Sequence, residues 1–71
     1  MEERIDAKFG RRVALYRLQI GLSQEQFAEK CNIHRTYIGA VERGEKSPTL
    51  KTIEKIANGL NVRISELFAD L

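Results

Sequence analysis

The sequence contains a single cysteine, Cys31, and a single histidine, His34. One cysteine cannot form an intrachain disulfide, and adding one histidine still falls short of the ligand sets that hold zinc in proteins. A small buried apolar side chain is a more common role for such a cysteine than a reactive thiol. We therefore expect neither a metal nor any other cofactor.

Long apolar stretches are also missing. No run approaches the roughly 20 residues that a membrane-spanning helix needs, and residues 1–6 are acidic and polar, unlike a secretory signal. Of the 71 residues, 42% are hydrophobic and 31% are charged, a composition typical of one globular domain with a modest core. The sequence predicts a single domain over residues 1–71, located in the cytoplasm.

The sequence also has few of the residue patterns that are typical of enzyme active sites. The sequence has no glycine-rich loop of the kind that cradles phosphates, and no pair of carboxylates placed for acid–base chemistry in so small a domain. Its single histidine and single cysteine offer few nucleophiles or bases. We therefore expect that the protein is not an enzyme.

The net charge is only +2, but the charges are unevenly distributed. Residues 30–51 contain five basic residues against two acidic ones, Glu42 and Glu45. Local positive charge in a short chain is a weak pointer to a polyanionic partner. A solvated helix face has a similar composition, so the charge pattern alone leaves both interpretations open.

Apolar residues recur at helical spacing in five segments, and no segment alternates long enough for a strand. In the first segment Ile5, Phe9, Val13 and Ile20 are expected to face the core. The sequence predicts an all-α fold, a compact domain whose five helices cover about residues 5–19, 23–31, 34–43, 50–60 and 64–71.

Residues with known capping roles mark the helix boundaries. Gly21 is expected to end the first helix in a left-handed conformation, and Ser23 with Gln26 forms the S-x-x-Q pattern of a capping box. Asn32 tolerates the left-handed turn that separates the second and third helices. His34 stands where the third helix should be capped and is a poor residue for that position.

The second and third helices are short and are joined by about three residues around Asn32, so they must cross steeply. This crossing exposes one side of the third helix, while Ile38 and Val41 anchor its other side. An exposed helix is about 10–12 Å across and fits the major groove of B-DNA, which is about 12 Å wide. The sequence therefore indicates a helix-turn-helix over residues 23–43.

The outward face of the third helix is expected to carry two kinds of residue. Arg35 and Thr36 can bond the edges of bases, while Gly39 and Ala40 leave room for close approach of DNA. Glycine inside a helix costs about 1 kcal/mol relative to alanine, which suggests a purpose for the bare face. Simpler interpretations stay open, since Arg35 can be a solvated surface charge and Gly39 neutral drift at an exposed position.

The segment 21–62 closely resembles the lambda-type (Cro and repressor, or Xre) helix-turn-helix family. The similarity is carried by LSQE at 22–25, by VERG at 41–44 and by SPTLKTIEKIANGL at 47–60. HRTYI at 34–38, followed by VERG in so short a chain, is similar in particular to the controller proteins of restriction–modification systems.

The resemblance implies a five-helix domain that binds DNA as a two-fold dimer, with each third helix in a major groove and half-sites about 34–36 Å apart. It places base contacts on Arg35, Thr36 and Ala40, with the arginine bonding O6 and N7 of guanine. It implies phosphate contacts from Gln24, Tyr37, Arg43, Lys46, Ser47 and Thr49.

The same resemblance implies a scaffold and a dimer interface. Arg17 and Glu42 match an ion pair that bridges the first and third helices. The helix over about residues 64–71 is expected to supply the interface, although an apolar edge at a chain end can also result from fraying. The interface residues are Phe68 and Leu71 on the outer side, with Ile64 and Leu67 closer to the core.

Four positions depart from the family pattern. Asn32 replaces a usual glycine, and His34 replaces a usual serine or threonine. Arg63 replaces another serine cap, which puts the start of the fifth helix in doubt. Ala40 stands where a longer polar residue is common, so part of the specificity should come from DNA shape.

We expect a dimeric, sequence-specific regulator of transcription that binds a pseudo-palindromic double-stranded DNA operator, as a restriction–modification controller protein does. The alternative is an antitoxin-type or phage-type repressor whose main partner is another protein. RNA polymerase is a further candidate partner through the acidic Glu25 and Glu29 of the second helix, although a solvated face also explains these residues.

Overall fold

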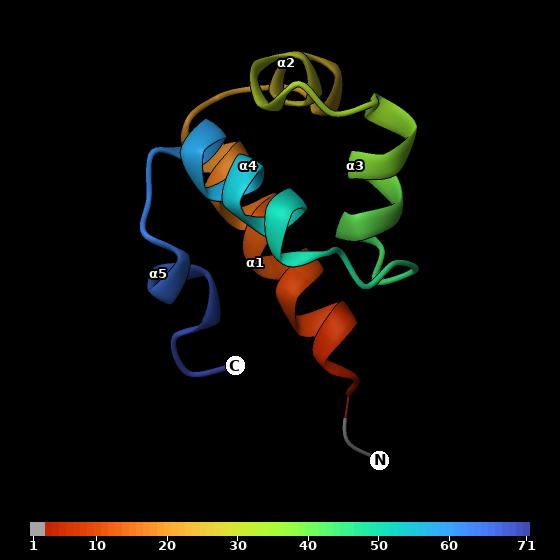
Figure 1. Cartoon of the computed structure of the whole chain (residues 1–71), viewed down its shortest axis with the longest axis vertical. Coiled ribbons are helices and arrows are strands. Elements are labelled where there is room, and N and C mark those ends of the chain that lie inside the picture. The colour runs from red at the N-terminus through yellow and green to blue at the C-terminus, as the bar shows by residue number, and fades with distance from the viewer. Residues whose placement is uncertain (1–2) are drawn as a thin grey trace.

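The computed structural model of the chain describes residues 3–71, which form five α-helices and no strand (Figure 1). The all-α fold predicted from the sequence is confirmed. The last helix ends at Phe68, earlier than expected, because Ala69 has extended dihedral angles (φ −61°, ψ 124°). The helices are α1 (Ile5–Gln19), α2 (Gln24–Cys31), α3 (Arg35–Glu42), α4 (Leu50–Leu60) and α5 (Ile64–Phe68).

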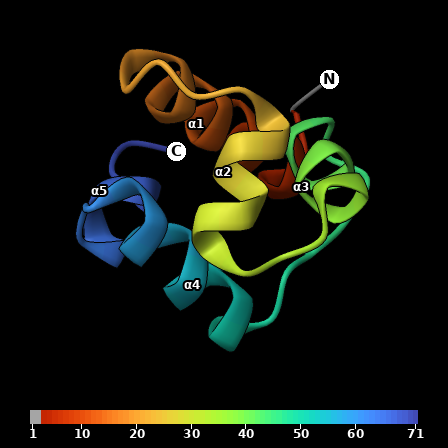
Figure 2. The ribbon, with the colours of Figure 1, turned by 90° about the horizontal axis from the view of Figure 1, so that it is seen from above.

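The long helix α1 is the element on which the others are assembled. It contacts α3, α4 and α5, while α2 contacts α3 and α4. Seen from above, α3 and α5 lie at opposite sides of the molecule, with α1, α2 and α4 between them (Figure 2). The helix-turn-helix and the C-terminal helix therefore present separate surfaces.

All five helices contribute to one core. Within residues 3–71 six large side chains are fully buried, and each stabilises the fold by about 1.5–3 kcal/mol relative to an exposed position. Of the residues predicted to face the core from the first helix, Phe9 and Val13 are buried. The prediction is wrong for Ile5 and Ile20, at the two ends of the helix, which are 55% and 43% exposed. The partners of α1 are shorter than α1 itself, so they cannot cover both of its ends. The fully buried set is Val13, Phe27, Ile38, Val41, Ile56 and Leu67.

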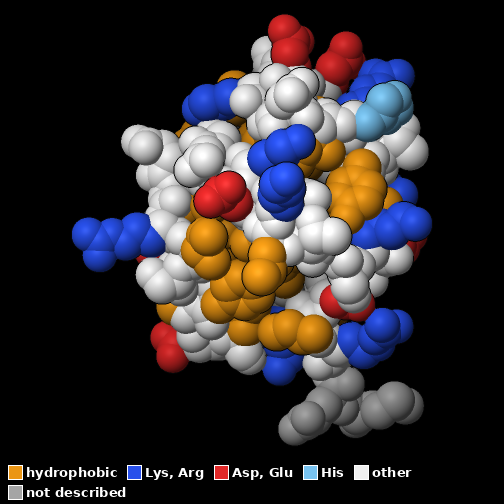
Figure 3. Space-filling view, viewed as in Figure 1, with side chains coloured by type: hydrophobic (Ala, Val, Ile, Leu, Met, Phe, Trp, Pro, Cys, Tyr) orange, Lys and Arg blue, Asp and Glu red, His pale blue; other side chains and the backbone are white. Residues whose placement is uncertain are grey.

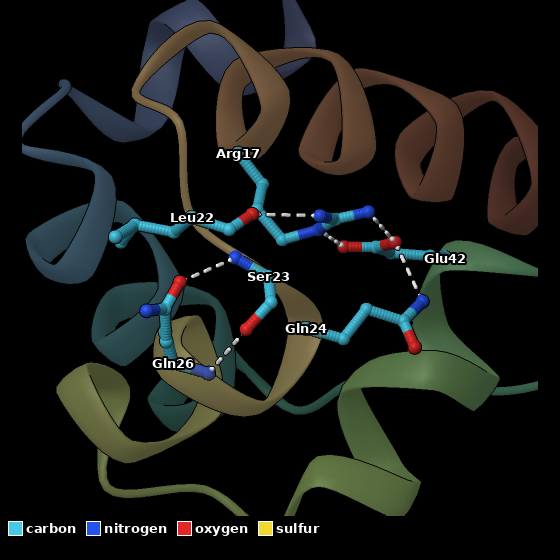
Figure 4. Close-up of polar contacts among 6 residues, drawn as sticks. All are labelled: Arg17, Leu22, Ser23, Gln24, Gln26 and Glu42. Carbon is cyan, nitrogen blue, oxygen red and sulfur yellow. Dashed lines mark hydrogen bonds and ion pairs between the residues drawn. The ribbon is translucent and has the colours of Figure 1, made fainter.

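The predicted caps of the helix-turn-helix are present. The hydroxyl of Ser23 accepts from the backbone N–H of Gln26 at 3.1 Å, and the Gln26 side chain accepts from the Ser23 N–H at 2.9 Å, which completes the capping box (Figure 4). Gly21 (φ 74°) and Asn32 (φ 58°) are left-handed, as expected. No helix in residues 3–71 is long and apolar enough to cross a membrane.

Gly10 allows α1 and α3 to approach each other closely. A Cβ atom at this position would lie 2.8 Å from the carbonyl oxygen of Glu42 and closer still to that of Val41. Both obstacles are backbone atoms, which cannot rotate away as the end of a side chain can. Gly10 thus fixes the distance between the two helices.

Replacing Gly10 with alanine should lower the free energy of unfolding by about 3 kcal/mol, because overpacking against backbone forces the helices apart. Gly39→Ala is the matched control, since it also adds a methyl group inside a helix. There the nearest atom is Nη1 at the flexible end of Arg43, 3.0 Å away, so the gain in helix propensity of up to about 1 kcal/mol should offset the contact. Urea unfolding of both variants measures the difference, and equal midpoints would contradict the assignment.

Cys31 is buried, as expected, and lies against Gly59 of α4. Burial raises the pKa of its thiol to about 11. The thiolate is the reactive form, so the folded protein should react slowly with thiol reagents near neutral pH.

At pH 8, labelling of Cys31 by a chromogenic disulfide should therefore proceed only as fast as the protein opens. Because the folded pKa lies above the unfolded value, the unfolded chain loses this proton first as pH rises. Stability should be unaffected by this group below about pH 8 and should fall between about pH 9 and 11. Labelling rates and urea midpoints at pH 8 and pH 10 test this, and a rate equal to that of free cysteine would contradict it.

Candidate nucleic-acid interface

The first turn of α3 faces solvent, and its remaining length is largely buried. Arg35 and Thr36 are exposed, while Tyr37 is half-buried against the core. The side chains of Ile38 and Val41 are fully buried and anchor the helix, as predicted. The exposed end of α3 therefore projects an arginine and a threonine from a firmly held helix.

His34 caps α3 itself, so the expectation of a poor cap is wrong. Its Nδ1 atom accepts from the backbone N–H of Thr36 at 3.1 Å. A neutral imidazole with an unprotonated Nδ1 has the acceptor that a serine hydroxyl supplies in other helices. The cap holds the backbone beside Arg35, the first residue of the helix.

The predicted bare outer face at Gly39 and Ala40 is also wrong. Both residues are buried, and the side chain of Ala40 is only 7% exposed. Gly39 lies beneath the side chains of Arg43 and Gln24. Because α3 has eight residues and packs against both α1 and α2, its exposed face is narrower than the sequence suggested. Ala40 is therefore not an exposed candidate for a base contact.

The ion pair implied between Arg17 and Glu42 is present and is nearly buried, with side chains 11% and 5% exposed. Nε and Nη2 of Arg17 donate to the two carboxylate oxygens at 2.7 and 3.0 Å, and its Nη1 donates to the carbonyl oxygen of Leu22 at 2.8 Å (Figure 4). The Gln24 amide also donates to Glu42, at 2.9 Å. This network ties α1, α2 and α3 together, and within residues 3–71 no buried side-chain nitrogen or oxygen lacks a partner.

A shallow hollow of about 290 Å³ lies between the start of α2 and the exposed face of α3. Four of the five residues that line it were predicted to contact bases or phosphates, and the fifth is the acidic Glu25. Arg35 donates to the carboxylate of Glu25 at 2.9 Å, and both side chains are largely exposed. The lining residues are Gln24, Glu25, Arg35, Thr36 and Arg43.

The loop after α3 carries the other predicted phosphate contacts. Arg43 forms two hydrogen bonds with Glu45, at 2.9 and 3.1 Å, which lower the pKa of the carboxyl group. Lys46 is exposed. The hydroxyl groups of Ser47 and Thr49 already have partners, because Ser47 donates to Asp6 and Thr49 caps α4.

The C-terminal residues predicted as a dimer interface divide into two groups. Leu67 is fully buried in the core, so it cannot belong to an interface, and Leu71 packs partly against the core. Ile64 and Phe68 are 44% and 38% exposed, and the Phe68 ring stacks on Phe9 with centroids 5.0 Å apart. Ile64 is thus further from the core than predicted.

These two exposed residues belong to a wider apolar face that includes the start of α4. Leu50, the first residue of α4, is 85% exposed. In Figure 3 apolar side chains gather over the start of α4 and α5. A groove of about 380 Å³ on this face is lined by Leu50, Lys51, Ile53, Glu54, Ile64 and Phe68.

The arrangement matches known proteins. Residues 13–67 match the family described as helix-turn-helix. The chain is 38% identical to the control protein C.MunI of Mycoplasma sp over 68 residues, which cover 94% of this chain and 92% of the relative. It is 41% identical to the control protein C.BamHI of Bacillus amyloliquefaciens over 68 residues, covering 94% and 84%.

A solved structure agrees with these relatives. The restriction–modification controller protein C.AhdI from Aeromonas hydrophila superposes with a TM-score of 0.87 at 41% identity, covering 89% of this chain and 96% of that one. Within residues 3–71 no group of three or more histidine, cysteine, aspartate or glutamate residues is placed to hold a metal ion. The capped helix-turn-helix, its buried ion pair and these similarities agree: the chain belongs to the helix-turn-helix family of DNA-binding transcriptional regulators.

Proposed function

We propose that the chain controls a restriction–modification operon by binding, as a dimer, to a pseudo-palindromic operator in the cytoplasm. Its similarity to C.MunI, C.BamHI and C.AhdI covers most of each protein and supports the assignment to this group. The observation that carries the proposal is the exposed end of α3, where Arg35 and Thr36 project beside a polar hollow.

In this proposal the first turn of α3 enters the major groove. Arg35 bonds O6 and N7 of a guanine, a bidentate contact worth about 1–3 kcal/mol of discrimination, and Thr36 contacts the neighbouring base. Buried Ala40 contributes no side-chain hydrogen bond, so DNA shape supplies further specificity.

Phosphate contacts flank the base contacts and position the helix. Arg43 and Lys46 are exposed cations beside α3 and take this role most directly. The Gln24 amide and the Tyr37 hydroxyl lie at the ends of half-buried side chains. For Ser47 and Thr49, whose hydroxyl groups have internal partners, backbone N–H groups are the better donors.

The apolar face over α4 and α5 is the proposed dimer interface. A groove with apolar walls, a lysine and a glutamate suits a two-fold contact, because each copy can present both charges to the other. The proposed interface consists of Leu50, Ile64 and Phe68. Leu71 lines a separate hollow beside α1 and stays a prediction.

Phe68→Ala should weaken the dimer and, through it, the binding of DNA. Because Phe68 also stacks on Phe9, Leu50→Ser is the cleaner variant, since Leu50 is almost wholly exposed and its loss leaves the monomer intact. We expect the dimer dissociation constant to rise at least tenfold in both, on the basis of about 1.5–3 kcal/mol per buried leucine or phenylalanine. Sedimentation equilibrium measures it, and an unchanged constant for Leu50→Ser would place the interface elsewhere.

RNA polymerase is the proposed further partner. Glu25 and Glu29 are both exposed on α2, as predicted. Glu25 is paired with Arg35, whereas Glu29 makes no side-chain hydrogen bond within residues 3–71. Glu29 is therefore the better candidate for a contact with polymerase.

Selection of bound sequences from a random duplex pool tests the main proposal. A dimer with α3 in the groove should enrich a two-fold symmetric site with half-site centres about 34–36 Å apart. Binding should weaken steeply with salt, because phosphate contacts release counterions. Failure to enrich any sequence would contradict a specific regulator and favour a protein partner.

A further inference from the structure

We propose that Glu25 is a positioning residue for DNA recognition: its carboxylate orients Arg35 toward guanine and disfavours DNA that lacks the site. The inference rests on the proposed function and concerns how its specificity arises. The observation behind it is a hydrogen bond in which Nη1 of Arg35 donates to Oε2 of Glu25 at 2.9 Å. This contact joins the first turns of α2 and α3, which both border the hollow.

The hydrogen bond leaves most of the guanidinium available. Within residues 3–71 it is the one hydrogen bond that the Arg35 side chain makes. A guanidinium has five N–H donors in a rigid fork, so the Nε–Nη2 edge can still bond both O6 and N7 of guanine. Restricting the flexible arginine stem before DNA arrives reduces the entropy lost on binding.

The negative charge of Glu25 also favours specific over non-specific binding. Glu25 is the acidic member of the hollow, whose other lining residues are neutral or basic. A carboxylate at this place repels the phosphates of any duplex, and it keeps Arg35 from pairing with a phosphate instead of a base. In a duplex with guanine at the contacted position, the bidentate bond from Arg35 to guanine offsets this repulsion. Other duplexes meet the repulsion without that bond, so the carboxylate raises the ratio of specific to non-specific binding.

A structural role for Glu25 makes a different prediction. Carboxylates in the first turn of a helix are stabilising because they face the positive end of the helix dipole. Loss of that effect would lower the stability of the domain but would not alter its preference among bases. The preference for guanine therefore separates the two roles.

The test compares Glu25→Gln with Glu29→Gln, which removes the same charge from the same helix. Each variant and the wild type are titrated with the selected operator, with the operator carrying A·T in place of the contacted guanine pair, and with an unrelated duplex. We expect Glu25→Gln to lose about two- to fivefold of guanine discrimination per half-site, the range of an exposed ion pair. Affinity for the unrelated duplex should rise, and its salt dependence should steepen by about 0.9 per phosphate that Arg35 gains.

Glu29→Gln should leave the discrimination unchanged. Unchanged discrimination in Glu25→Gln, or an equal loss in both variants, would overturn the inference. Thermal unfolding verifies that both variants are folded, and Glu25→Asp, which keeps the charge on a shorter side chain, should retain the low affinity for unrelated DNA. If the wild type enriches no operator, the proposed function fails. If the wild type enriches an operator and Glu25→Gln keeps the same preference for guanine, only the inference about Glu25 fails.

Discussion

Arg35→Ala should reduce affinity for the selected operator by about 2–6 kcal/mol, because each of the two half-sites loses a bidentate guanine contact worth about 1–3 kcal/mol. Selection with the variant should show a relaxed preference at one position in each half-site. The fold should be unaffected, since the Arg35 side chain is exposed and its ion pair with Glu25 lies at the surface.

Two further arginine variants serve as comparisons for Arg35→Ala. Arg43→Ala removes a proposed phosphate contact, so it should weaken binding to all duplexes alike and flatten the salt dependence. Arg11→Ala is the matched control, since Arg11 is an exposed arginine paired with an acid, Glu3, on the outer side of α1. A loss of base preference in Arg43→Ala would contradict its role as a phosphate contact. A loss of affinity in Arg11→Ala would contradict the assignment of the interface to α3.

Glu42→Ala should have the largest effect on stability. Removing it leaves the buried guanidinium of Arg17 with one partner, the carbonyl oxygen of Leu22, and breaking one half of a buried pair costs about 3–5 kcal/mol. The Gln24 amide loses its acceptor as well. Because the network joins three helices, α3 should become mobile and DNA binding should fall along with the unfolding midpoint.

A double replacement shows why Glu42→Ala is unstable: because the ion pair with Arg17 is lost, or because the buried charge of Arg17 is left without a partner. Replacing Arg17 with methionine and Glu42 with leucine removes both charges while filling similar space, and such exchanges are often neutral or stabilising. The double variant should therefore be more stable than Glu42→Ala in urea unfolding. If it is equally unstable, the polar network itself, and not its charge balance, holds the helices.

Local signals explain why most of the fold could be predicted. The capping box at Ser23 and Gln26, and the left-handed residues Gly21 and Asn32, depend on neighbours within a few positions. Such interactions can be read from a short window of sequence. The pair between Arg17 and Glu42 is not local and came from the family resemblance, which supplied the contact between distant helices.

The errors arose where burial depends on packing between helices. Ala40 was expected at the surface, yet it is buried in a helix that packs against both α1 and α2. Leu67 was expected in an interface but belongs to the core, while Leu50 is almost fully exposed. Gly10 gave no signal in the sequence, because its importance is a close approach to the backbone of a helix about thirty residues away along the chain.

The close contact at Gly10 has an evolutionary consequence. It sets the distance between α3 and α1, while Arg35 and Thr36 project from the exposed first turn of α3 and lie outside the core. Under the proposed base contacts, a lineage can exchange these two side chains and acquire a different operator without having to restore the stability of the fold. Descendants of one such scaffold can diverge in the genes they govern while keeping the same architecture.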